Sequence, residues 1–97
     1  MYEMQQTSVF TEWHKSLRDR RARGLIVSRL FRLTAGNFGD AKSVGDGVHE
    51  LRIAFGPGYR VYFTRRGERI ILLLCGGDKG SQARNIDRAK RMAAELE

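Results

Sequence analysis

The sequence has few of the residues that cross-link a chain or anchor it in a membrane. Its 97 residues include one cysteine, Cys75, so no disulfide can form within the chain and a zinc site built from several cysteines is excluded. The longest apolar run, IILLLC at residues 70–75, is far too short to cross a bilayer. The first ten residues lack a basic segment followed by an apolar run, so we expect no signal peptide and a cytoplasmic location.

Acidic residues are scarce relative to basic ones. Lysine and arginine number 18 against 11 aspartates and glutamates, which gives a formal net charge of +7. Such an excess on a small domain favours a polyanionic partner, although a merely solvated cationic surface would have the same composition. Hydrophobic residues make up 41% and charged residues 30%, as in ordinary globular proteins, and the length fits one domain over residues 1–97.

The apolar pattern along the chain predicts an α+β fold with an antiparallel sheet. Phe10, Trp13 and Leu17 recur at helical spacing after a possible cap at Thr7 or Ser8. The other expected elements are a possible edge strand within 1–7, a helix over about 20–35, a glycine-rich loop over 36–47, strands near 48–55, 59–65 and 69–75, and a last helix from about Ser81. Helices that are segregated from consecutive strands are typical of this class.

The segment ELRIAFGPGYRVYF, residues 50–63, predicts a hairpin with arginines on one face. If Gly56-Pro57-Gly58 is a three-residue loop, Phe55 pairs with Tyr59 and the core face is apolar throughout. Arg52 and Arg60 then lie diagonally on the opposite face, within reach of one ligand.

Arg52, Arg60, Tyr62 and Lys79 together indicate a phosphodiester-binding site. Guanidinium groups bind phosphate with two parallel hydrogen bonds, an ammonium group acts as a point charge, and a phenol can stack on a base or pass a proton. The alternative is a solvated sheet face on which Arg52 pairs with Glu50 or Asp46. We expect structural roles for His14, His49 and Cys75, and we expect no metal site because the sequence contains no cluster of ligands.

Two longer segments resemble a known family. They are GNFGDAKSVGDGVHELRIAFGPGYRVYF, which begins at Gly36, and ILLLCGGDKGSQARNIDRAKRMA, which begins at Ile71. With them, nearly the whole chain is similar to the HigB/RelE-type toxins of bacterial toxin–antitoxin pairs, the group called addiction module killer proteins. The resemblance implies two N-terminal helices packed on a small curved antiparallel sheet, followed by a C-terminal helix.

The resemblance also implies an activity and partners. Such toxins are mRNA endoribonucleases that act on ribosome-bound message without a metal or other cofactor, through attack of the RNA 2′-OH on the adjacent phosphate. The partners implied are mRNA, the ribosome and an antitoxin encoded beside the toxin, with a helix-turn-helix expected in it. A ParE-like gyrase inhibitor without catalysis, or a degenerate toxin that only binds nucleic acid or antitoxin, would share the fold.

Site residues follow from the same resemblance. Arg52 and Arg60 match the strand arginines assigned to the scissile phosphate. Lys79 matches the basic residue after the last strand, which is expected to bind the phosphate or act on the leaving group. Tyr62 is assigned as proton carrier or stacking surface. Lys42, Tyr59 and Asp78 are assigned to RNA binding, and Lys42 is expected to hold flanking RNA. The general base stays open.

Overall fold

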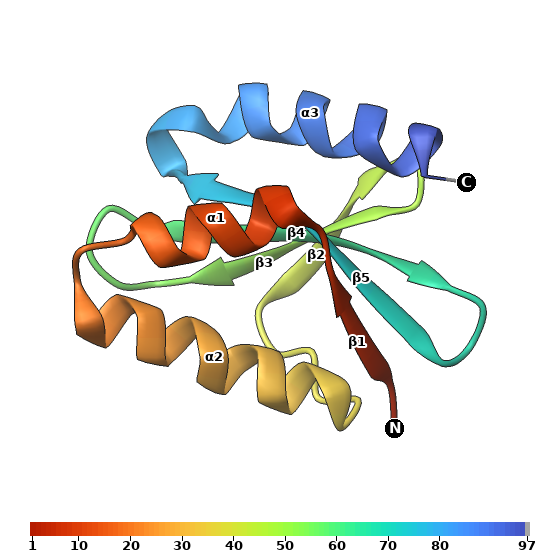
Figure 1. The fold of residues 1–97 in the computed structure, drawn as a ribbon, viewed down its shortest axis with the longest axis horizontal. Coiled ribbons are helices and arrows are strands. Elements are labelled where there is room, and N and C mark those ends of the chain that lie inside the picture. Colours follow the sequence, from red (N-terminus) through yellow and green to blue (C-terminus); the bar gives the residue numbers. More distant parts are fainter. Residues whose placement is uncertain (97) are drawn as a thin grey trace.

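The chain begins with a short strand that leads directly into two helices, as Figure 1 shows for the computed structural model, which describes residues 1–96. In chain order the elements are β1 (Glu3–Gln6), α1 (Ser8–Ser16), α2 (Arg20–Thr34), β2 (Ala41–Gly45), β3 (Val48–Ile53), β4 (Tyr59–Arg66), β5 (Ile70–Asp78), the 3-10 turn η1 (Lys79–Ser81) and α3 (Gln82–Glu95). None of the helices in this described part of the chain is long and apolar enough to cross a membrane.

Side-chain caps fix where the first two helices begin. Thr7 accepts a hydrogen bond from the Phe10 amide at 3.1 Å, and its own hydroxyl donates to the Leu74 carbonyl at 2.6 Å, which ties the start of α1 to β5. Asp19 caps α2 by accepting from the amides of Arg21 and Ala22. Each cap satisfies amides that the helix itself leaves without partners, so both helix starts are set locally.

One five-stranded sheet forms the middle layer, in the order β1-β5-β4-β3-β2. Helices α1 and α2 lie against one face, and α3 lies along the other (Figure 1). Strand β5 is therefore covered on both sides, which explains why its sequence is apolar in every position from 70 to 75.

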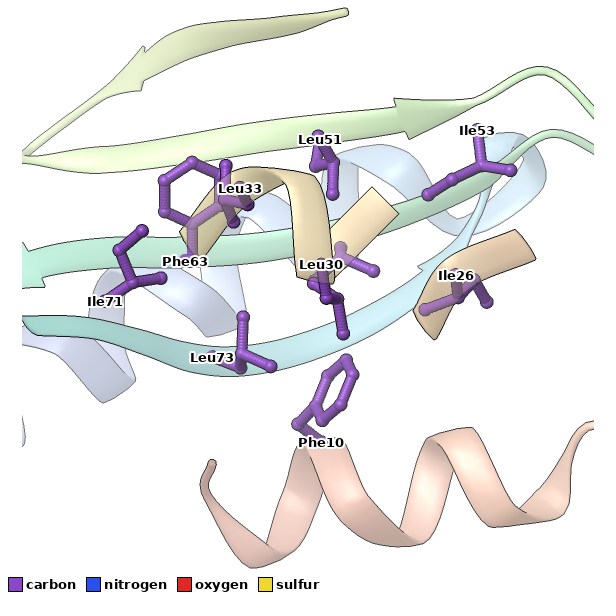
Figure 2. Close-up of a cluster of buried hydrophobic side chains, with 10 residues drawn as sticks. Phe10, Ile26, Leu30, Leu33, Leu51, Ile53, Phe63, Ile71 and Leu73 are labelled. Atoms are coloured by element: carbon purple, nitrogen blue, oxygen red, sulfur yellow. The ribbon is translucent and has the colours of Figure 1, made fainter. Parts of the chain in front are cut away.

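Each face of the sheet has its own apolar cluster. Figure 2 shows the larger one, in which Phe10 of α1 and Ile26, Leu30 and Leu33 of α2 meet residues of β3, β4 and β5. On the other face, Val48, Tyr62 and Leu74 of the sheet pack against Ala89 and Ala93 of α3. The small side chains of α3 let this helix lie close to the strands.

The α+β class is confirmed, but the antiparallel sheet is not. Strand β1 pairs in parallel with β5, with Glu3 opposite Ile70, so the sheet is mixed. Two helices and three strands separate β1 from β5 along the chain, which is ample length for the crossover that a parallel pair requires. The loop expected over 36–47 is also wrong in part, because Ala41–Gly45 form edge strand β2.

The β3–β4 hairpin differs from the expected register by two residues. Ile53 lies opposite Tyr59, and Arg52 lies directly opposite Arg60, so residues 54–58 form the loop. Phe55 leaves the strand and turns toward α2, where the Arg21 guanidinium lies 5.6 Å from its ring centre. A shift of two residues preserves the faces, so the expected division into an apolar and an arginine face is confirmed.

Two glycines of β5 allow the helices to approach the sheet. A Cβ at Gly76 would lie 2.3 Å from the Trp13 ring of α1, and a Cβ at Gly77 would lie 1.8 Å from the Asn85 amide nitrogen of α3. Neither space could hold a methyl group unless the side chain of Trp13 or Asn85 moved. The pair Gly76-Gly77 therefore sets the depth at which a helix packs on each face.

Candidate functional site

A row of residues crosses three strands on the α3 face of the sheet. Arg52 of β3 lies directly opposite Arg60 of β4, and Arg60 lies opposite Gly77 of β5. Like charges directly opposite one another destabilise a sheet unless other groups compensate them. The structure thus brings the two arginines closer together than the diagonal arrangement expected from the sequence.

Arg52 has a carboxylate partner other than the two expected. Its Nε and Nη2 lie 3.2 and 2.9 Å from the same Asp40 oxygen, and its side chain is 37% exposed. The alternative pairings with Glu50 or Asp46 are therefore wrong. Asp40 reaches Arg52 because its carbonyl also accepts the Arg52 amide, which holds the chain just before β2 against β3.

Arg60 is much more enclosed than Arg52. Its side chain is 12% exposed, and its Nε lies 3.9 Å from Oε2 of Glu50, a carboxyl group that is fully buried. The Nε atom itself is buried, so the exposed fraction belongs to other atoms of the side chain. Arg60 therefore reaches the surface only at part of its length.

Tyr62 follows Arg60 on the same face of β4, opposite Glu50 of β3, and has no exposed surface. Its hydroxyl donates to Oε2 of Glu50 at 2.9 Å. Burial, and then the hydrogen bond to Glu50, raise the pKa of Tyr62 above its ordinary value, so the phenol stays protonated at physiological pH. A ring in this position has no face available to a base, so the assigned stacking role does not fit the geometry.

Lys79 lies just past the row, at the start of η1, and is exposed. A Cβ at Gly58 would lie 3.5 Å from the Lys79 Cβ, so the β3–β4 loop and the exit of β5 are neighbours. Asp78 next to it is engaged locally, because its Oδ1 accepts from the Ser81 amide at 3.2 Å and caps the turn. Lys79 is therefore exposed near the β3–β4 loop, whereas the carboxyl group of Asp78 is occupied in capping η1.

The remaining assigned residues divide between the two faces. Lys42 is exposed on β2, opposite Glu50 and in line with Tyr62, so it shares the arginine face. Tyr59 lies on the opposite face, where its ring meets the edge of Trp13 at a centroid distance of 6.4 Å. The structure therefore separates Tyr59 from the arginines.

Three residues of the site carry no assignment from the sequence: Asp40, Glu50 and Gln82. Asp40 lies in a glycine-rich stretch for which the sequence predicts a loop, and Gln82 has no feature that distinguishes it from other polar residues at the start of a helix. Glu50 was considered only as a surface partner of Arg52. The one sequence feature that bears on its burial is alternation, which places Glu50 on the same face of the strand as the apolar Val48.

The other titratable residues have local structural contacts. His14 lies 3.2 Å from the Arg23 carbonyl, His49 stacks on Phe63, and Cys75 is buried. Burial raises the pKa of the Cys75 thiol to about 11. Among residues 1–96, no group of three or more histidine, cysteine, aspartate or glutamate side chains lies close enough together to hold a metal ion.

The arrangement is suited to an anion that touches several cations at once. Guanidinium groups opposite each other repel, and a phosphate between them would relieve that repulsion while it accepts hydrogen bonds from both. The first turn of α3 contains no acidic residue, and helix N-termini attract anions. Fold and site together define a small α+β domain with a cationic site beside the N-terminus of its last helix.

Comparison with known proteins places the chain in a family. It is 47% identical over 94 residues to an uncharacterized protein of Haemophilus influenzae (strain ATCC 51907 / DSM 11121 / KW20 / Rd), and the match covers 97% of this chain and 95% of that protein. The chain therefore belongs to the same family as that protein. No protein-family model matches the chain. The toxin resemblance stays a prediction.

Proposed function

We propose that this protein is the toxin of a bacterial toxin–antitoxin pair and cuts mRNA in the cytoplasm, on the ribosome, without a metal or other cofactor. The observation that carries the proposal is the direct opposition of Arg52 and Arg60 beside the N-terminus of α3. The net charge of +7 supports an RNA substrate, since a cationic surface attracts the phosphate backbone before any specific contact forms.

In the proposed reaction the 2′-OH of one nucleotide attacks the adjacent phosphorus, and the bond to the 5′-oxygen breaks. The products are a 2′,3′-cyclic phosphate and a 5′-hydroxyl end. Arg52 and Arg60 hold the phosphate and stabilise the extra negative charge of the transition state. Lys79 protonates the leaving oxygen, and Lys42 holds flanking RNA. The general base is not assigned.

Induced expression in growing bacteria tests this function. We expect growth arrest together with new mRNA 5′-ends inside coding regions. Arg60→Ala should abolish both, because it removes the guanidinium between Arg52 and Gly77. Arg69→Ala is the matched control, since it removes an exposed arginine at the β4–β5 turn. Arrest with intact message would reject the nuclease and point to another target.

The antitoxin partner is a second element of the proposal. Helix α2 exposes Val27 and Phe31, the latter at 77%, on one side of its buried stripe and Leu25 on the other, and it also exposes several arginines. Such a surface fits an acidic partner with apolar side chains. Co-expression with the product of the adjacent gene should yield a stable complex. Two separately purified proteins that never associate would argue against the pair.

A ParE-like inhibitor that binds gyrase without catalysis is the second candidate function. The same exposed apolar side chains of α2 favour it, because a binding-only toxin needs a contact surface and no reaction centre. The two candidates differ in one respect that is easy to measure. A gyrase inhibitor would keep its toxicity in Arg60→Ala and lose it when Phe31 is replaced by serine.

A further inference from the structure

Glu50 is a fully buried carboxyl group in a protein with a small core. Removing a carboxylate from water costs several kcal/mol unless hydrogen bonds and a nearby cation compensate. Strand β3 places Glu50 between Val48 and Arg52 on the α3 face, where α3 covers the sheet. The free-energy cost of burying the Glu50 carboxyl group here must be offset by the contacts that it makes.

All close contacts of Glu50 converge on one oxygen. Oε2 accepts from the Tyr62 hydroxyl at 2.9 Å and from Nε2 of Gln82 at 2.8 Å, and it lies 3.9 Å from Nε of Arg60. These three partners come from β4 and from the first residue of α3. The carboxyl group thus joins the strand that carries Arg60 to the helix end that borders the site.

Two buried polar atoms of the Glu50–Arg60 pair lack hydrogen-bond partners within the described part of the chain. Among residues 1–96, neither Oε1 of Glu50 nor Nε of Arg60 has a hydrogen-bond partner, although both atoms are buried. The two side chains are thus close enough for strong electrostatic attraction and are not locked by a short hydrogen bond. A small movement of Arg60 toward Glu50 would complete that bond.

We propose that Glu50 is a positioning residue for the nuclease reaction. Its buried carboxylate attracts the Nε end of Arg60, 3.9 Å away, and so orients the outer end of the guanidinium toward the phosphate. The same carboxylate accepts a hydrogen bond from Gln82, the first residue of α3. This inference rests on the proposed function for its effect on cleavage. Glu50 does not touch RNA, because it is covered by Tyr62, Gln82 and Arg60.

Glu50→Gln tests the inference because it removes the charge and keeps the size. In a translation extract with a defined message, we expect the turnover number to fall about 100-fold with a small change in KM, since the exposed cations still bind RNA. Ile71→Val, a core change on the opposite face, is the control for lost stability. Both variants are compared at a temperature at which circular dichroism shows them fully folded.

A double-mutant cycle separates positioning from a general structural effect. If Glu50 acts through Arg60, Glu50→Gln should cause little further loss in an Arg60→Lys background. A loss of equal size in both backgrounds would overturn the inference. Full activity of folded Glu50→Gln would overturn it as well.

A second measurement does not depend on any nuclease activity. In ¹⁵N NMR spectra, the Nε–H signal of Arg60 can be assigned as the one lost in Arg60→Lys. Because Nε is buried beside the Glu50 carboxylate, we expect this proton to exchange slowly with water in the wild type and at least tenfold faster in Glu50→Gln. Unchanged exchange would refute the positioning role, whereas slow exchange in a wild type that cleaves no message would reject only the proposed function.

Discussion

Individual side chains on the two faces of the sheet have different electrostatic surroundings. On the arginine face, Arg52 and Arg60 each lie beside a carboxyl group of their own, Asp40 and Glu50. These carboxyl groups offset the repulsion between the guanidinium groups. The site is therefore compatible with the folded state when no anion is bound, and it still favours one.

His49 gives a pH dependence of stability that can be measured. Burial, and then the positive charge of Arg65, lower the pKa of His49 in the folded protein below 6.5. The unfolded chain then binds more protons between the two pKa values, so stability falls as the pH drops from about 6.5 toward the lowered value. Thermal unfolding at several pH values should show this fall.

His49→Phe is the matched variant for that experiment. It keeps an aromatic ring next to Phe63, whose centre lies 5.3 Å from that of His49, and it removes the titration. We expect the decline in Tm between pH 7 and pH 5 to become shallower. An unchanged slope in this variant would show that other groups cause it.

Cys75 should be protected from alkylation in the folded protein. Its pKa of about 11 is two units above the value of 9.0 for a free thiol, so about 100-fold less thiolate is present at pH 8. Iodoacetamide should therefore label the native protein at least 100-fold more slowly than the protein in guanidinium chloride. Equal rates would contradict the burial of Cys75.

At the scale of elements, the contacts of β5 with the helices depend on glycine. Gly76→Ala would place a methyl group within the Trp13 ring of α1, so we expect a loss of about 1–3 kcal/mol in the free energy of unfolding. Gly24→Ala is the matched control, because Gly24 lies within α2 with no atom near its Cβ position. It should gain about 0.5–1 kcal/mol.

Chemical denaturation of the two variants measures both effects. The midpoint should move down for Gly76→Ala and up for Gly24→Ala, although the chemical change is the same. Two shifts of the same sign would mean that helix α1 does not pack against β5 as closely as the structure has it.

The sequence predicts those elements whose apolar pattern is long and regular. Periodicity predicts the helix at 20–35, the last helix and strands near 48–55 and 59–65, which the structure has as α2, α3, β3 and β4 with slightly different ends. The sequence does not predict β2, because glycines surround a short strand of alternating exposure. Nor does it predict the parallel pairing of β1 with β5, because the two strands are separated by most of the chain. The hairpin register shifts by two residues, which side-chain alternation cannot detect.

The candidate site was predictable only in part for similar reasons. Alternation puts Arg52, Arg60 and Tyr62 on one face, and this holds in the structure. Alternation does not predict how deeply each side chain on a face is buried. It therefore gives no sign that Tyr62 and Glu50 are buried while Lys42 is exposed. The pairing of Arg52 with Asp40 needs β2, which the sequence did not predict.

For the molecule as a whole, the sheet separates two surfaces with different properties. One side presents the arginine row, Lys42 and Lys79 beside the N-terminus of α3. The other carries α1 and α2, and α2 exposes apolar side chains as well as arginines. In the proposed function, RNA contacts the first surface and a protein partner can cover the second without entering the site.

Cleavage of a defined message by the purified protein in a bacterial translation extract, with identification of the new RNA ends, tests the central claim most directly. We predict fragments with 5′-hydroxyl ends from wild type and Arg69→Ala, and none from Arg60→Ala. Cleavage that persists in folded Arg60→Ala, or a message that stays intact with the wild type, would contradict the assignment of the arginine row to RNA cleavage.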